Sequence, residues 1–140
     1  MTNSEIKRPV PAQSAFVDVE QFWRGAREGK LLLQYCPESK RFQHFPRPLS
    51  MYTGKRNLEW KEVSGNGTVY AHTALRTQGL GADGRLPLVL ATIELDEGVR
   101  ILGNVLNAQP GDVQIGARVR LAWDALAEGV QYPAFELEAK

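Results

Sequence analysis

The sequence predicts a mainly β protein with one N-terminal helix, a ribbon-shaped segment and a small barrel of about five strands. Three observations support this fold class. After residue 60, short stretches of alternating apolar and polar residues are separated by turn residues, and none has a strong helical pattern. Near the N-terminus, one stretch has the residue spacing of an amphipathic helix. Between the two lies a proline-containing segment whose polar residues recur at the spacing of paired metal-binding turns.

The composition suits one ordinary domain, or a small domain with an appendage. Of the 140 residues 43% are hydrophobic and 24% are charged, so a packed core is expected. The net charge of +1 argues against a protein whose main function is to bind the phosphate backbone of a nucleic acid. A single cysteine excludes an intramolecular disulfide and an all-cysteine metal site. Without a signal peptide or an apolar run of ~20 residues, the chain is expected to be soluble, cytoplasmic and not membrane-bound.

Residues 1–30 are expected to form a mobile arm and a helix. The first 13 residues are polar and contain two prolines, which favours an extended arm. From about residue 18 to residue 28 the apolar positions share one helical face, and Gly29 is suited to end the helix. These apolar positions are Val19, Phe22, Trp23 and Ala26. The adjacent aromatic residues Phe22 and Trp23 either pack on the domain or present a surface to a partner.

The segment of residues 31–62 has the outline of a zinc ribbon. "KLLLQYC" predicts a strand, residues 37–57 indicate irregular loops, and "LEWKEV" is again extended. Cys36 opens a C-P-x-S turn in which the second cysteine of a knuckle is replaced by Ser39. Ser50 and Thr53 have the same spacing further along.

Residues 63–140 are expected to form the barrel. "GNGTVYAHTALR" alternates after a bend at Gly65 and Gly67, and "PLVLATIELD" and "EGVRILGNVLN" predict a hairpin. A strand over residues 118–123 and a closing strand, "VQYPAFEL", follow. A glycine-rich loop, residues 77–86, separates the first two strands. Among small barrels, the OB-fold fits this pattern best.

The order of these stretches resembles the family known as domain of unknown function 35. The likeness runs from about residue 16 to residue 137 and is carried by "FWRGAREGKLLLQYC", "FPRP", "LEWKEVSGNGTVYAHT", "ATIELDEGVRILGNV", "VQIGARVRL" and "YPAFEL". The resemblance implies an N-terminal helical segment, a rubredoxin-like zinc ribbon and an OB-fold.

Members of this family usually carry two C-x-x-C pairs, and the matching positions here are Cys36, Ser39, Ser50 and Thr53. A structural zinc site requires about four nitrogen or sulfur donors, for which neutral hydroxyls are poor replacements. Even with His44 beside Cys36, only two ordinary ligands would be present. We therefore expect no zinc and no other cofactor. The expected chain is an N-terminal helix, a metal-free remnant of a zinc ribbon and a small five-stranded OB-fold barrel.

Without a metal, another interaction must hold the ribbon segment together. Apolar packing is the expected replacement, because each fully buried large side chain contributes about 1.5 to 3 kcal/mol. The candidates are Leu33, Tyr35, Phe42, Phe45, Leu49, Met51, Tyr52 and Trp60.

Basic residues crowd the same segment. Lys40, Arg41 and Arg47 are either solvated surface charges or binding groups for an anion such as the phosphates of coenzyme A. Since the resemblance implies acyl-CoA as a ligand of the complex, we keep these three residues as candidate CoA-binding residues.

The sequence shows no convincing catalytic set. Cys36 could pair with His44 or His72, but a lone cysteine is more typical of an inert, buried side chain. The resemblance implies a non-catalytic accessory subunit of a thiolase-like acyl-CoA-processing complex, in which the partner carries out condensation, thiolysis or retro-aldol cleavage. Phe22, Trp23 and the knuckle loops are the expected contact surface, and a homodimer is left open.

Two alternatives are kept. An OB-fold can bind single-stranded nucleic acid through stacked aromatic residues over a basic groove. Tyr70, His72 and Trp123 could form such a platform, although the balanced charge argues against it. A free-standing enzyme acting on acyl-CoA would need an acid, a base and a nucleophile that the sequence does not show.

Overall fold

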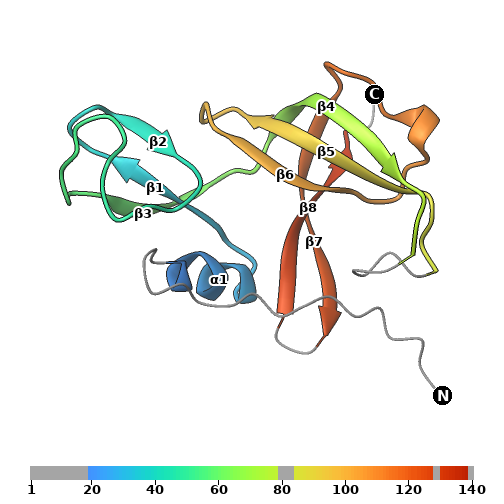
Figure 1. Ribbon diagram of the computed structural model, residues 1–140, viewed down its shortest axis with the longest axis horizontal. Helices are drawn as coiled ribbons and strands as arrows, with labels where there is room; N and C mark the ends of the chain where they lie inside the picture. The colour runs from blue at the N-terminus through green and yellow to red at the C-terminus, as the bar shows by residue number, and fades with distance from the viewer. Residues whose placement is uncertain (1–18, 79–83, 128–129, 139–140) are drawn as a thin grey trace.

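The computed structural model describes residues 19–78, 84–127 and 130–138. In these residues a helix, a three-stranded sheet and a closed barrel follow one another along the chain (Figure 1). The expected N-terminal arm and the middle of the glycine-rich loop lie outside the described residues. Within the described residues, no helix is both long and apolar enough to cross a membrane.

Helix α1 (Glu20–Arg27) lies against both the ribbon and the barrel. Phe22 and Ala26 are 7% and 1% exposed, which confirms the predicted apolar face. The helix ends before Gly29, whose φ of +73° is the left-handed conformation common after helix ends. Gln131 donates a hydrogen bond of 3.1 Å from Nε2 to the carbonyl oxygen of Ala26, which ties the helix to the C-terminal hairpin.

The ribbon is a three-stranded antiparallel sheet in the order β2–β1–β3. Its strands are β1 (Leu31–Cys36), β2 (Arg41–Gln43) and β3 (Glu59–Val63). The expectation of irregular loops throughout residues 37–57 is therefore wrong at β2. Three residues are too few for an alternating pattern to be recognised, and β2 is defined by its pairing with β1.

The barrel has five strands in the closed order β4–β5–β6–β8–β7. The strands are β4 (Gly67–Leu75), β5 (Leu88–Leu95), β6 (Arg100–Val105), β7 (Arg118–Ala127) and β8 (Val130–Leu137), with a 3-10 turn η1 (Pro110–Asp112) before β7. Pairs are antiparallel except for β6 and β8, which are parallel. This closed mixed barrel confirms the OB-fold prediction.

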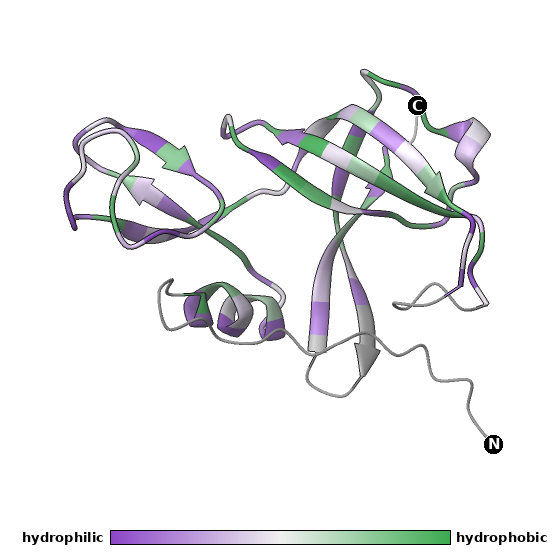
Figure 2. Cartoon of the chain, in the orientation of Figure 1, coloured by the Kyte–Doolittle hydropathy of each residue, from purple (hydrophilic) through white to green (hydrophobic). Residues whose placement is uncertain are grey.

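Alternating side chains fill the barrel core. Ile93, Val119 and Phe135 are fully buried, and Figure 2 shows hydrophobic colour along much of β5 and β6. Every second side chain of a strand can reach the core, because successive side chains point to opposite faces of a sheet.

Gly65 forms the bend between the ribbon and the barrel. Its φ is +78°, and an added Cβ would lie 2.4 Å from Cβ of Leu121. We expect Gly65→Ala to lower the free energy of unfolding, measured in urea, by about 2 to 3 kcal/mol, because backbone strain and a steric clash add together.

Gly98→Ala is the matched control for this prediction. Gly98 has a φ of +93°, but no atom beyond its two chain neighbours lies within 4 Å of an added Cβ, so only the backbone strain of about 1 kcal/mol applies. Equal decreases in the free energy of unfolding of the two variants would show that the steric clash with Leu121 does not contribute.

Candidate functional site

The four positions that match zinc ligands lie in two tight turns. In the first turn, the amide of Lys40 donates to the carbonyl oxygen of Cys36 at 2.7 Å. In the second turn, Oγ of Ser50 accepts hydrogen bonds from the amides of Tyr52 and Thr53 at 3.1 and 3.2 Å. Both turns that the sequence places at ligand positions are therefore formed, with Cys36 and Ser39 on the first and Ser50 and Thr53 on the second.

Two serine hydroxyls stabilise the sulfur of the first turn. Hydrogen bonds from Ser39 and Ser50 lower the pKa of the Cys36 thiol to about 7, although burial acts in the opposite direction. The Cys36 side chain is fully buried. A thiolate at this position is thus stabilised by hydroxyl groups of the neighbouring turns.

These donors do not fit a structural zinc ion. One thiol and three hydroxyls lack the nitrogen and sulfur donors that zinc requires. Within the described residues, no group of three or more His, Cys, Asp and Glu side chains could hold a metal ion. His44 lies against the rings of Phe22 and Phe45, with centroids 5.5 and 4.8 Å away. That purified protein contains no zinc stays a prediction, which elemental analysis can check.

A pair of buried glutamines holds the loop between the two turns. Nε2 of Gln43 donates to Oε1 of Gln34 at 2.9 Å, and the side chains are 1% and 3% exposed. Gln34 also bonds both the amide and the carbonyl oxygen of Arg47, each at 2.8 Å. Gln43 bonds the carbonyl oxygen of Leu49 at 3.2 Å and the amide of Met51 at 2.8 Å. We call Gln34 and Gln43 the glutamine clamp.

The clamp adds a polar contribution to the apolar packing that was expected to replace the metal. Phe45, Leu49 and Met51 are 67%, 38% and 54% exposed, so they contribute little to the core of the ribbon. Tyr35 and Phe42 do pack together, with ring centroids 4.9 Å apart. Sequence reasoning missed the glutamines because glutamine is usually a surface residue.

The three candidate CoA-binding residues all lie on the ribbon and are exposed. Lys40 is in the first turn, with a φ of +58°. The guanidinium of Arg41 lies over the ring of Tyr52 at 4.2 Å. The backbone of Arg47 is held by the clamp. Their role in binding a phosphate stays a prediction.

The three residues of the alternative nucleic-acid platform have different surroundings. The guanidinium of Arg100 lies 3.7 Å from the ring centroid of Tyr70 and bonds to Glu94. Trp123 packs against the barrel core, whereas His72 is exposed on β4. The ring of Tyr70 is thus covered by the Arg100 guanidinium, and the ring of Trp123 is packed against the barrel core.

An apolar groove of about 280 Å³ lies where α1, the ribbon and the barrel meet. We call it the junction groove. It is lined by Val19, Phe22, Trp23, His44, Phe45, Pro46, Leu90, Ile101, Leu102, Gly103, Asn104, Tyr132 and Pro133. Burial lowers the pKa of His44 to about 4, so its ring is neutral at neutral pH.

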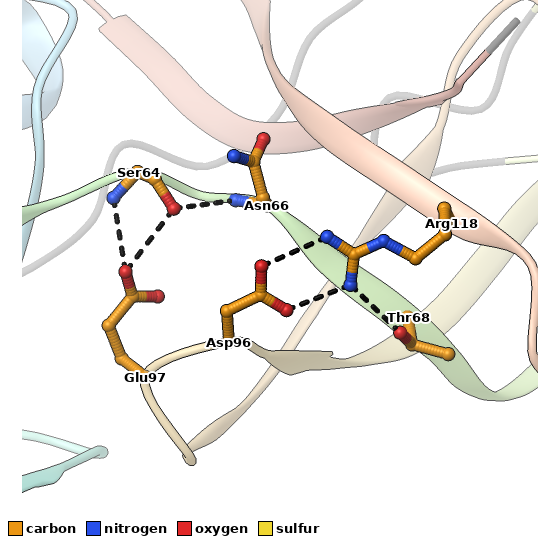
Figure 3. Close-up of polar contacts among 6 residues, drawn as sticks. All are labelled: Ser64, Asn66, Thr68, Asp96, Glu97 and Arg118. Atoms are coloured by element: carbon orange, nitrogen blue, oxygen red, sulfur yellow. Dashed lines mark hydrogen bonds and ion pairs between the residues drawn. The ribbon is translucent and has the colours of Figure 1, made fainter.

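A polar network joins the end of the ribbon to the barrel (Figure 3). The carboxylate of Glu97 accepts hydrogen bonds from the amide and the hydroxyl of Ser64 at 3.3 and 3.2 Å. Asp96 accepts two hydrogen bonds from the guanidinium of Arg118 at 2.8 and 2.9 Å, and Arg118 also bonds Oγ1 of Thr68. The turn between β5 and β6 thus anchors the segment that leads out of the ribbon.

The Asp96 contact makes stability depend on pH. Hydrogen bonds from Arg118 lower the pKa of Asp96 in the folded protein. Its stabilisation is therefore full above the unfolded pKa of about 3.9 and is lost as pH falls through the folded pKa. We expect Asp96→Asn to lower the urea midpoint at pH 7 and to have a smaller effect at pH 3. An equal difference at both pH values would contradict this assignment.

The chain is similar in sequence to one family of domains and to several known proteins. Residues 60–124 match the family described as ChsH2, C-terminal OB-fold domain. The chain is 30% identical over 115 residues to a probable enoyl-CoA hydratase alpha subunit of Thermomonospora curvata, covering 81% of this chain and 36% of that protein. It is 30% identical over 112 residues to a DUF35 domain-containing scaffold protein of Methanocaldococcus jannaschii, covering 79% of each. The chain thus spans about a third of the length of the first relative and most of the second.

Among solved structures, the chain is similar to a chain of the Ltp2-ChsH2(DUF35) aldolase. The TM-score is 0.81 with 27% identity, and the match covers 91% of this chain and 98% of that chain.

Proposed function

Because this chain belongs to the DUF35 family, we propose that it is a non-catalytic accessory subunit of a thiolase-like acyl-CoA-processing complex. The partner would carry out condensation, thiolysis or retro-aldol cleavage. The observation that carries the proposal is the likeness over nearly the whole length of a chain in a complex named as an aldolase. The placement of Cys36 among hydroxyls and of His44 between phenyl rings also supports a non-catalytic role.

The loops of the ribbon are the proposed contact surface, whereas Phe22 of α1, which was expected to belong to it, is buried in the domain. Phe45, Leu49 and Met51 are large apolar residues that the ribbon exposes, a property that is common in protein interfaces. Residues 19–63 contain nine Lys and Arg against five Asp and Glu, so this segment is cationic although the whole chain is nearly neutral. Lys40, Arg41 and Arg47 would then face either an acidic partner surface or the phosphates of coenzyme A.

Co-purification with a thiolase-like protein of the same organism tests this proposal. We expect a complex that elutes together in size-exclusion chromatography, and Met51→Asp should weaken it. Ile115→Asp is the matched control, because Ile115 is 72% exposed on the barrel. Turnover of acyl-CoA by the isolated chain, or the absence of any complex, would overturn the proposal.

A further inference from the structure

We propose that the junction groove binds the apolar segment of an amphipathic anion, with an acyl thioester as the chemical class. The identity of the ligand rests on the proposed function. The binding site itself rests on the shape, the polarity and the charge of the groove.

The walls of the groove come from three separate units. Trp23 on α1 and Tyr132 on β8 form one side, with ring centroids 5.4 Å apart. His44 and Phe45 of the ribbon form another side, and Leu102 of β6 stands on the barrel side. Small-molecule sites are commonly found where structural units meet and where apolar walls surround a few polar groups.

The groove itself carries no ionised side chain at neutral pH. None of its lining residues is Asp, Glu, Lys or Arg, and burial keeps His44 neutral. A phosphate or carboxylate placed inside would lose its hydration without gaining a counter-charge, which is unfavourable. An apolar chain meets no such cost, because burying it removes apolar surface from water.

Charge near the groove favours an anionic head on the same ligand. Part of the groove lining comes from the cationic segment, residues 19–63. Arg47 directly follows Pro46, which lines the groove, and the Arg47 side chain is exposed. A ligand with an apolar tail and phosphates would therefore match both the uncharged groove and the basic ribbon.

The volume limits what can be buried. At about 280 Å³ the groove is slightly smaller than typical small-molecule pockets, which measure about 300 to 1,000 Å³. It can thus take a part of an acyl-CoA and not the whole molecule. Phe45 and Leu102 line the groove, are 67% and 62% exposed, and would be partly covered by the bound chain.

Fluorescence quenching can test this proposal on the full chain. In a Trp60→Phe/Trp123→Phe variant, Trp23 is the only tryptophan left. We expect 10-bromodecanoate to quench it in a saturable manner, and decanoyl-CoA to displace the probe more strongly than coenzyme A alone. If the double variant does not fold, calorimetric titration of the unaltered chain with decanoyl-CoA and with coenzyme A answers the same question.

Two exposed apolar residues provide a matched pair of variants. Leu102→Asp places a charge at the groove and should weaken binding of the probe at least ~10-fold. Ile115→Asp makes the same change at an exposed position that does not line the groove, and should change binding by less than about twofold. Equal effects of the two variants, non-saturable quenching, or equal displacement by coenzyme A and decanoyl-CoA would overturn the proposal.

The outcome is separable from that of the proposed function. A chain that binds decanoyl-CoA in the groove but forms no complex keeps this inference and rejects the accessory role. A chain that forms the complex but shows no saturable quenching rejects the groove as an acyl site.

Discussion

Replacing Ser39, Ser50 and Thr53 together with cysteine should turn the ribbon into a zinc site and stabilise this module by as much as about 10 kcal/mol at saturating zinc. The reason is that both turns lie beside the Cys36 thiol, since the hydroxyls of Ser39 and Ser50 both lower its pKa. Four thiolates would then supply the charge and the soft donors that the natural side chains lack.

Cobalt titration and elemental analysis show whether the triple variant binds a metal ion. We expect the triple variant to bind one metal ion, with the visible absorption of tetrahedral cobalt thiolate, and the unaltered chain to bind none. The matched control is the triple variant combined with Cys36→Ser, which removes the fourth thiolate and should bind much more weakly. Failure of the triple variant to bind metal would mean that the two turns do not keep the geometry of a knuckle pair. Stoichiometric zinc in the unaltered chain would refute the metal-free ribbon.

Gln43→Leu should destabilise the ribbon by about 4 kcal/mol. The substitution removes three hydrogen bonds and leaves Oε1 of Gln34, the carbonyl oxygen of Leu49 and the amide of Met51 each without one of its partners. A buried polar group that loses its partner costs about 1 to 3 kcal/mol. Urea unfolding measures the total decrease in the free energy of unfolding. Faster hydrogen exchange at the amide of Met51 would show that the destabilised part is the loop held by the clamp.

Gln114→Leu provides the comparison, because Gln114 is exposed. This change should alter the free energy of unfolding by less than about 0.5 kcal/mol. A Gln43→Leu variant as stable as Gln114→Leu would show that the ribbon is held by other contacts, and the role of the clamp would have to be abandoned.

Local patterns accounted for much of the architecture. The helix could be predicted because Phe22 and Ala26 repeat at helical spacing, and the hairpin of β5 and β6 because two apolar runs flank a short turn. The OB-fold followed from the number and order of such strands. All of these signals depend on residues close together in the sequence.

The glutamine clamp and the junction groove depend on long-range placement. Gln34 and Gln43 face each other only because of the register between β1 and β2, and β2 is too short to be recognised by its pattern. The groove requires Trp23, His44 and Tyr132, from three units, to meet. Sequence periodicity does not indicate which distant residues come into contact, so neither feature could have been predicted before the structure was known.

The position of β8 also determines when the groove can exist. β8 is the last barrel strand to leave the ribosome, yet it is inserted between β6 and β7 rather than added at an end. It also contributes Tyr132 and Pro133 to the groove wall. A nascent chain that still lacks this strand therefore has neither a closed barrel nor a complete groove wall.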